Sequence, residues 1–414
     1  MKLVMGLRIK MIIVKLFIKI KHFLSHPLLT IKVRGKGPSA KIERAIKYCF
    51  YKLKYGKNVI LFESHYVFDG NSGALYKYLR SKRKYNKYTF VWLVKGYIDG
   101  TVKNTRHDLF FSLENQSGLK KYLCGISKFA FYDDVPIKAG AKSGKTIHLS
   151  HGQLALKNIK GIIKTPDYVN YALCISEHYK PYFCQDIGCP PEKIFICGLP
   201  RNDILFSEKV DVSTYFETSR YEKIILWLPT FRKVNWCDRN DETKELPFGI
   251  PLFYTEDQIK MIDNFLKDKN ILLVLKLHPV QDLGVIQINN VNNIIFIEHQ
   301  SLIKNRIGTN YLYPYADAMI SDYSSAATDF MLMDKPLAYI IEDQDNYKLK
   351  LPQELYNKRT PGTKIKTVDD LKNFLQSVFD GDDEFRNERR EFVNYIHTYK
   401  DGENCKRIVK MFNI

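Results

Sequence analysis

The sequence predicts an α/β protein built from two successive doubly wound domains. From residue 58 onward, short runs rich in Val, Ile, Phe and Tyr alternate with segments of helical periodicity, which is the pattern of repeated β-α units around a parallel sheet. A length of 414 residues with 45% hydrophobic residues favours two cores over one or three. The strand-like runs fall into two groups, so we expect two sheets.

The first half, residues 58–210, is expected to form one Rossmann-like domain. Its predicted helices are Ser72–Lys82 and Leu113–Cys124, and the polar stretch 207–219 is the predicted hinge. Its predicted strands are Val59–Phe62, Thr89–Val94, Phe129–Tyr132, Thr146–Leu149, Ala172–Ser176 and Ile194–Cys197.

The second half, residues 220–366, is expected to form the other Rossmann-like domain, with a helix at Glu256–Lys267 and a long surface loop at Val234–Pro247. Residues 367–414 are predicted to be helical, including Val368–Phe379 and Glu384–His397. The predicted strands of this half are Ile224–Leu228, Leu272–Leu277, Ile294–Ile297, Ala318–Ser321 and Leu337–Ile341.

Positive charge is concentrated at the start of the chain. Residues 1–60 contain 15 Lys or Arg and one acidic residue, Glu43, and so hold 14 of the 19 net positive charges. Within the first 24 residues, the longest unbroken apolar run is Met11–Val14, too short to span a bilayer. Residues 1–57 are therefore predicted to be a basic amphipathic segment on an anionic membrane surface, the alternative being packing on the body or on a partner. Nucleic acid is not expected as a partner, because the folded body carries little of the excess charge.

Cysteine and acidic residues give no sign of a metal site. The eight cysteines include no CxxC pair and no Cys/His cluster with zinc-ligand spacing, so reduced cytoplasmic thiols are expected. No acidic DxD-type cluster calls for a divalent ion. No cofactor is required on these grounds, and a role for Mg2+ is left open.

Polar motifs follow the predicted strands, where ligands bind in doubly wound sheets. In the first half, His151-Gly152 and then Lys157 follow one strand, and Gly198-Leu199-Pro200-Arg201-Asn202-Asp203 follows another. His151 is a candidate catalytic base and Arg201 a candidate phosphate or carboxylate ligand. The alternatives are a histidine bonded to loop carbonyls and a structural turn in which Arg201 pairs with Asp203.

In the second half, Pro229-Thr230-Phe231-Arg232 ends one strand, and Lys276-Leu277-His278-Pro279 ends another. His278 is expected to face the cleft as a donor to phosphate oxygen. Arg232 is either a nucleotide contact or ordinary surface.

The most diagnostic stretch begins with a strand and continues into a serine-rich turn and a helix. Hydroxyls and N–H groups at a helix N-terminus can bind phosphate without a glycine-rich loop, and helix capping is the alternative role for the serines. Its candidate residues are Ser321, Asp322, Ser324, Ser325 and Asp329.

Taken together and in this order, the five motifs resemble those of the CDP-glycerol glycerophosphotransferase family of teichoic acid and capsule synthesis. That family shows a strand-end HGTPLK-like motif, G-x-PRND, PTFR, R/K-x-HP and [ST]DYSS followed four residues later by Asp. The match runs from about His151 to Asp329, with a weaker echo at Phe62-Glu63-Ser64 and Gly70-Asn71.

The resemblance implies a GT-B fold, with an acceptor domain at 58–210 and a CDP-donor domain at 220–366 facing a central cleft. It implies attack of a lipid-linked or polymer-terminal hydroxyl on CDP-glycerol, with release of CMP. By position, His151 looks like the general base and His278 like the stabiliser of the transferring phosphoryl group. The implied donor-binding residues are Pro229, Thr230, Arg232, Lys276, Ser321, Asp322, Ser324, Ser325 and Asp329, and other cleft residues are Gly152, Lys157, Arg201 and Asp203.

The sequence departs from the family pattern at two places. Gln153 and Leu154 replace the family's Thr and Pro, on the side expected to face the acceptor. Lys276 replaces Arg, which keeps the charge but loses the planar fork.

Several readings compete with a glycerol phosphate transferase. CDP-ribitol is an alternative donor, and a GT-B glycosyltransferase using a CMP-sugar is an alternative enzyme that shares an HP motif and paired serines. A catalytically dead membrane scaffold is disfavoured by the presence of both His151 and His278. The expected location is peripheral, on the cytoplasmic face of a bacterial cell membrane.

Overall fold

The computed structural model describes residues 38–55, 58–96, 98–154, 156–230, 246–278, 288, 290–345 and 347–414. Of the predicted membrane-associating segment, only helix α2 (Pro38–Tyr55) lies within these residues. The candidate ligand Arg232 lies outside the described residues, and so does most of the predicted surface loop at Val234–Pro247.

Packing divides the chain into two compact units. The first holds the described residues up to Val67 together with Tyr76–His148 and Asp167–Asn170. The second holds Phe68–Leu75, Leu149–Pro166 and Tyr171–Ile414. The domain boundaries expected at residues 57, 210 and 366 stay a prediction.

The first sheet has seven strands in the order β3-β2-β1-β4-β5-β6-β7, and the pairs β1/β2, β2/β3, β1/β4, β4/β5 and β6/β7 are parallel. Its strand order reverses between β1 and β4, as expected of a doubly wound sheet. Its strands are β1 (Val59–Ser64), β2 (Thr89–Val94), β3 (Asp108–Ser112), β4 (Ser127–Tyr132), β5 (Lys145–His148), β6 (Tyr171–Cys174) and β7 (Ile194–Ile196).

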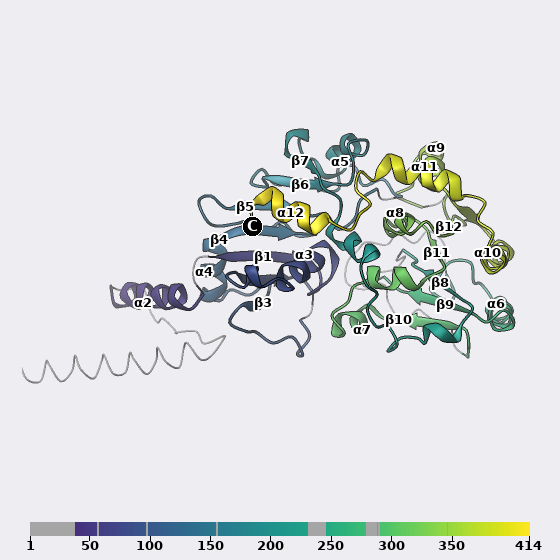
Figure 1. Cartoon of the computed structure of the whole chain (residues 1–414), viewed down its shortest axis with the longest axis horizontal. Helices are drawn as coiled ribbons and strands as arrows, with labels where there is room; N and C mark the ends of the chain where they lie inside the picture. Colours follow the sequence, from purple (N-terminus) through teal and green to yellow (C-terminus); the bar gives the residue numbers. More distant parts are fainter. Residues whose placement is uncertain are drawn as a thin grey trace, which may run out of the picture. The chain divides into compact units, whose positions relative to one another are not determined.

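The second sheet has six parallel strands in the order β10-β9-β8-β11-β12-β13 (Figure 1). Its order reverses between β8 and β11, so the carboxyl ends of these two neighbours mark the topological switch point. Its strands are β8 (Lys223–Trp227), β9 (Ile271–Lys276), β10 (Ile294–Ile297), β11 (Ala318–Ser321), β12 (Leu337–Ile340) and β13 (Thr363–Ile365).

Both faces of the second sheet are buried, because successive side chains of its apolar strands point to opposite faces. Leu273 and Leu275 of β9 pack with α6 (Glu256–Asp268) and α10 (Val368–Asp380) in one core cluster. Leu272 and Val274 of the same strand join a different cluster with α8 (Ala326–Phe330). Figure 1 shows α6 and α10 near one another beside this sheet.

Residues of the first unit also pack on both faces of their strands. Phe50 and Tyr51 of α2 pack with Leu119 and Leu123 of α4 (Gly118–Ile126) in one cluster. Rings stack on the other face, where Phe62 contacts Trp92 and Phe131 at centroid distances of 5.4 and 5.8 Å.

The remaining helices are α3 (Gly70–Arg80), α5 (Lys180–Ile187), α7 (His299–Lys304), α9 (Gln353–Arg359), α11 (Arg386–Ile396) and α12 (Asn404–Phe412). The predicted α/β class with two parallel sheets is confirmed. Strands β3 and β13 were not predicted. The helix predicted from Leu113 begins later, at Gly118, because Ser117 caps α4 by accepting a bond from the Lys120 N–H. Among the described residues, no helix combines the length and hydrophobicity needed to cross a bilayer.

Candidate functional site

The described site residues all fall in the second unit and follow its strands or β5. Lys276 ends β9 and Ser321 ends β11. His151 lies in the loop after β5, and Arg201 lies in a 3-10 helix, Pro200–Phe206, after β7. These candidate residues therefore lie at or after the ends of strands.

The His151 loop has an unusual backbone. Ser150 and Leu154, on either side of the histidine, adopt φ values of 71° and 54°, in the left-handed region that non-glycine residues rarely enter. The His151 side chain is exposed, and its backbone carbonyl accepts a bond of 2.5 Å from Nη1 of Arg201. The His151 side chain is therefore accessible, while Arg201 holds the backbone of the loop.

Gly152 is required by a close approach. A Cβ atom at this position would collide with Oγ of Ser325 and lie 3.1 Å from Nη2 of Arg201. The close neighbour of Gly152, one of the cleft residues implied by the resemblance, is therefore a serine of the β11 turn.

Gln153 and Leu154, which replace the Thr and Pro of the family motif, pack inside the protein. Both side chains are buried, at 2% and 3% exposure. The Gln153 amide donates to the Leu173 carbonyl at 2.5 Å and accepts from the Ile175 N–H at 3.0 Å, which ties the loop to β6. The expectation that these residues lie on a face open to an acceptor is wrong, because a buried amide must satisfy its hydrogen bonds within the protein.

Arg201 joins three motifs. Its Nη2 lies 2.6 Å from Oδ2 of Asp329, whose side chain is only 2% exposed. The neighbouring Asn202 donates to the other Asp329 oxygen at 3.0 Å. We call Arg201, Asn202 and Asp329 the Arg201 group. Together with the bond to the His151 carbonyl, this group connects the HG, PRND and DYSS motifs.

Asp203 does not pair with Arg201, so the alternative reading of that turn is wrong. Its two carboxylate oxygens accept bonds of 2.8 Å from the N–H groups of Asn404 and Cys405, the first residues of α12. Burial raises the pKa of Asp203 to about 6, against the lowering effect of these bonds. Asp203 therefore caps the C-terminal helix.

Asn71, one of the weaker sequence echoes, is fully buried behind the His151 loop. Its amide nitrogen donates to the Ser150 carbonyl at 2.7 Å, and its oxygen accepts from the Arg201 N–H at 3.0 Å. Glu63, from the other echo, lies in the first unit, where burial raises its pKa to about 8.

A second group of charged residues surrounds His278. Burial lowers the pKa of His278 well below its usual value, and so do the charges of four neighbouring basic residues: Lys276, His151, Lys157 and His299. Lys276 itself is 3% exposed, and burial lowers its pKa to about 8 while the carboxylate of Asp69 raises it. We call Lys157, Lys276, His278 and His299 the basic cluster.

Asp69 and His299 were not predicted from the sequence. His299 Nε2 lies 3.2 Å from Oδ2 of Asp69. Burial favours protonation of Asp69, but His299, the Gly70 N–H and Lys276 together lower its pKa overall. Asp69 follows Phe68, whose φ of 67° is another left-handed value with no signal in the sequence.

The serine turn is held by Asp322. This buried carboxylate accepts bonds from the Thr230 N–H at 2.9 Å and from the Thr230 hydroxyl, which joins the ends of β8 and β11. Ser324 Oγ accepts from the Ala326 N–H at 3.2 Å within the turn, whereas the side chain of Ser325, the N-cap residue of α8, makes no capping bond. Oγ of Ser321 is buried and has no hydrogen-bond partner among the described residues.

The helix after the turn, α8, spans only 5 residues, so its dipole is weaker than the sequence suggested. Pro229 is buried, and Lys157 is half-buried. Within the described ranges, no group of three or more His, Cys, Asp or Glu side chains could hold a metal ion.

Comparison with known proteins identifies the family. Residues 46–413 match the model of the CDP-glycerol:poly(glycerophosphate) glycerophosphotransferase family. The chain belongs to this family.

Characterised relatives make teichoic acids. The chain is 26% identical over 321 residues to a teichoic acid poly(ribitol-phosphate) polymerase of Bacillus spizizenii, a match that covers 70% of this chain and 47% of the relative. It is also 26% identical over 266 residues to a teichoic acid glycerol-phosphate primase of Bacillus subtilis, covering 63% of this chain and 62% of the relative. The chain thus spans about half to two thirds of the length of these members of the glycerophosphotransferase family.

A solved structure confirms the fold. The wall teichoic acid polymerase TagF superposes with a TM-score of 0.64 and 17% identity, covering 90% of this chain and 94% of that chain. The GT-B-like α/β architecture implied by the family resemblance is therefore confirmed for this chain.

Proposed function

We propose that this protein transfers a polyol phosphate, glycerol phosphate by preference, from a CDP-activated donor to a lipid-linked or polymer-terminal hydroxyl in teichoic acid or capsule synthesis. The observation that carries the proposal is the basic cluster at the end of β9. Lys276 is buried there beside Asp69, and His278 has four basic neighbours, an arrangement that an anionic phosphate group would stabilise. Membership of the glycerophosphotransferase family supports the same chemistry.

In the proposed reaction, the acceptor oxygen attacks the β-phosphorus of the donor. A new P–O bond forms, the bond from the β-phosphorus to the oxygen bridging the two phosphates breaks, and CMP leaves with that electron pair. His151 takes the acceptor proton, which its exposed imidazole can reach. His278 and Lys276 stabilise the charge on the transferring group.

The donor-binding set stays a prediction at Pro229, Thr230, Arg232, Lys276, Ser321, Asp322, Ser324, Ser325 and Asp329. The described contacts refine it: Asp322 orients Thr230, and Asp329 orients Arg201. Ser321 offers a buried hydroxyl with no protein partner among the described residues. A requirement for Mg2+ is tested by adding a chelator to the assay.

The acceptor is proposed to be held at the cytoplasmic face of the membrane, with the basic residues 1–57 on anionic lipid. Deleting residues 1–30 should abolish binding to anionic vesicles and leave donor hydrolysis intact. Vesicle binding that survives the deletion contradicts this part of the proposal.

Ribitol phosphate is the second candidate group, because a matched relative is a ribitol-phosphate polymerase. A CMP-sugar donor is the remaining alternative within the same architecture.

The deciding experiment measures CMP release from CDP-glycerol, CDP-ribitol and CMP-sialic acid in the presence of a lipid-linked acceptor analogue. His151→Ala and His278→Ala should abolish release from the preferred CDP-polyol, whereas His178→Ala, which changes an exposed histidine of the same unit, should not. Release from CMP-sialic acid alone would overturn the proposal.

A further inference from the structure

A short turn in the connection from β5 to β6 places two isoleucine side chains on the surface. Ile162 and Ile163 are 61% and 44% exposed. The Ile162 N–H donates to the Ile159 carbonyl at 3.1 Å, and Gly161 has a φ of 79°, the left-handed value that a type II turn requires at its third residue. We call residues 159–164 the isoleucine turn.

The isoleucine turn is held at both ends and open at its apex. The Asn158 N–H donates to the Leu349 carbonyl at 2.7 Å. The N–H and the hydroxyl of Thr165 both donate to the Ile187 carbonyl at 2.8 Å. A Cβ atom added at Gly161 would meet no atom of the described residues within 4 Å. Because its ends are fixed, the turn can bind a partner with little loss of conformational entropy.

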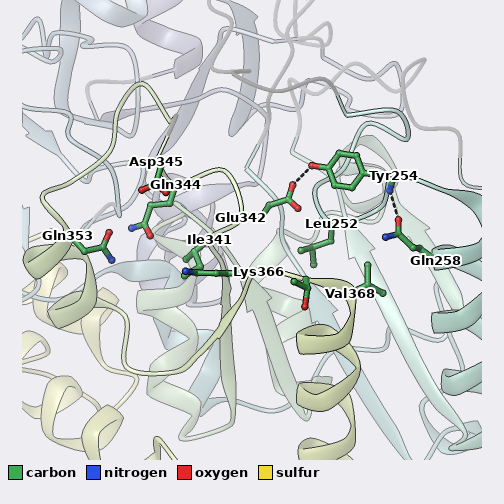
Figure 2. A pocket seen from close by; sticks show the side chains of 11 residues that line it. Leu252, Tyr254, Gln258, Ile341, Glu342, Gln344, Asp345, Gln353, Lys366 and Val368 are labelled. Carbon is green, nitrogen blue, oxygen red and sulfur yellow. Dashed lines mark hydrogen bonds between the residues drawn. The ribbon is translucent and has the colours of Figure 1, made fainter.

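Aliphatic residues that line a hollow of the same unit are covered far more completely. Figure 2 shows a pocket of about 430 Å³ at the carboxyl ends of β12 and β13, whose lining includes Leu252 and Val368. These two side chains are only 2% and 6% exposed. The isoleucine turn instead leaves adjacent apolar side chains in water, and burying them against a partner is favourable.

Positive charge flanks the two isoleucines. Lys160 and Lys164 are exposed, and residues 149–166 contain three lysines and no acidic residue. Burial raises the pKa of Asp186 on α5, and Lys160 is one of the groups that oppose this rise. Tyr182, one helical turn before Asp186, is 46% exposed. Aliphatic side chains and a tyrosine flanked by lysines are typical of protein surfaces that lie among lipid headgroups.

We propose that the isoleucine turn inserts into the headgroup region of an anionic bilayer and forms a second membrane contact, separate from residues 1–57. The two isoleucines enter the boundary with the acyl chains, while the exposed lysines of the turn bind anionic headgroups. The same connection from β5 to β6 carries His151, so the contact holds the proposed base near a lipid-linked acceptor. This use of the contact rests on the proposed function, whereas the contact itself does not.

A second contact changes what each membrane-binding element contributes. Two weak contacts on one chain hold it on a membrane far more firmly than either does alone. Loss of the isoleucine turn should therefore leave only marginal binding through residues 1–57, just as deletion of residues 1–30 leaves only the turn.

The test measures cosedimentation of the full chain with vesicles of phosphatidylglycerol and phosphatidylcholine, without any donor. The double variant Ile162→Ser, Ile163→Ser should bind at least tenfold more weakly than wild type, because two apolar side chains no longer enter the membrane. Lys160→Gln should weaken binding about fivefold, and wild type should bind pure phosphatidylcholine poorly. Met261→Ser is the matched control, since Met261 is 37% exposed but lies on α6, a helix with an acidic first turn.

Fluorescence quenching separates insertion into the bilayer from adsorption to its surface. Brominated lipid should quench Ile162→Trp beyond the quenching seen in wild type, because the added indole enters the membrane. Met261→Trp should show no added quenching.

The outcomes also separate this proposal from the transferase function. Unchanged vesicle binding by the folded double variant, no added quenching in Ile162→Trp, or no vesicle binding by wild type overturns the proposal. A wild-type dimer in sedimentation velocity that the double variant loses, with vesicle binding unchanged, assigns the turn to a second copy of the chain and also overturns it. Vesicle binding that weakens as expected, with no CMP release from any donor, supports the membrane contact and contradicts the transferase function.

Discussion

The Arg201 group and the basic cluster, both in the second unit, differ in how their charges are balanced. Arg201 faces the carboxylate of Asp329 at 2.6 Å, with Asn202 on the second oxygen. In the basic cluster, His278 has four basic side chains near it, and Asp69 is the carboxylate that acts on Lys276. Breaking a buried pair with a matched carboxylate is costly, whereas a group with more basic side chains than carboxylates is suited to an anionic ligand.

The largest expected effect is on the balanced group. Asp329→Asn leaves Arg201 without its carboxylate, and breaking a buried pair costs about 3–5 kcal/mol of unfolding free energy. Urea unfolding at pH 7 measures it. Arg386→Ala is the control, because Arg386 is 52% exposed where it pairs with Asp334, and losing that pair should cost under about 1 kcal/mol. Equal costs for the two variants would remove the distinction between the Arg201 group and surface ion pairs.

Gly152→Ala should have the next largest effect. The added methyl group collides with Ser325 Oγ, and overpacking of this kind costs about 1–3 kcal/mol. Because the contact joins two motifs of the site, CMP release should fall as well. The double variant Gly152→Ala, Ser325→Ala should regain most of the unfolding free energy that Gly152→Ala loses. If it regains none, the contact with Ser325 is not the cause of the loss.

The folds of the two sheets could be predicted because fully buried parallel strands form unbroken apolar runs. Strand β9, with the sequence ILLVLK, is buried at all six positions. Strand β13 was missed because it has only 3 residues, with Lys364 at its centre, and pairing with β12 determines it. Strand β3 was missed because Asp108–Ser112 carries polar residues at both ends.

The positions of the site residues could be predicted, but their partners could not. His151, Arg201 and Asp329 were selected because each follows a strand or its turn. The pairing of Arg201 with Asp329 depends on how loops distant in the sequence meet, and no local pattern encodes that. The roles of Asn71, Asp69 and His299 are likewise tertiary, although Asn71 had a weak motif signal.

A smaller effect is expected at the end of the PRND turn. Asp203→Ala removes the cap of α12 and should lower the unfolding free energy by about 1–2 kcal/mol. Asp203→Asn keeps one of the two acceptor oxygens and turns an amide donor toward the other N–H, so it should recover only part of the stability that Asp203→Ala loses.

The pH dependence of the unfolding free energy tests whether Asp203 is buried as the structure shows. The folded pKa of Asp203 is raised to about 6, so the folded carboxylate takes up a proton more readily than the unfolded one. Relative to Asp203→Asn, wild type should therefore gain stability as the pH falls from about 6 to about 4. A constant difference between the two proteins over this range would contradict the assigned burial.

The smallest expected effect concerns the basic cluster. The folded pKa of His278 is lowered by burial and by Lys276, His151, Lys157 and His299, so the unfolded chain binds a proton more readily near pH 6.5. Wild type should lose stability as the pH falls from about 6.5 to 5, and His278→Gln should lose about 1 kcal/mol less over that interval. The comparison is made between variants because His148 and His397 also have lowered pKa values.

The protonation of His278 can also be used to test nucleotide binding. Anionic phosphate beside His278 raises its pKa, so binding of CDP-glycerol, whose diphosphate has no group that titrates near neutral pH, should take up a proton, seen as a buffer-dependent heat in calorimetry. His278→Gln should abolish most of that proton uptake, whereas Asp203→Asn should leave it unchanged. Proton uptake that persists in His278→Gln would place the phosphate away from the basic cluster. The contrast between the Arg201 group as structural and the basic cluster as a ligand site would then no longer hold.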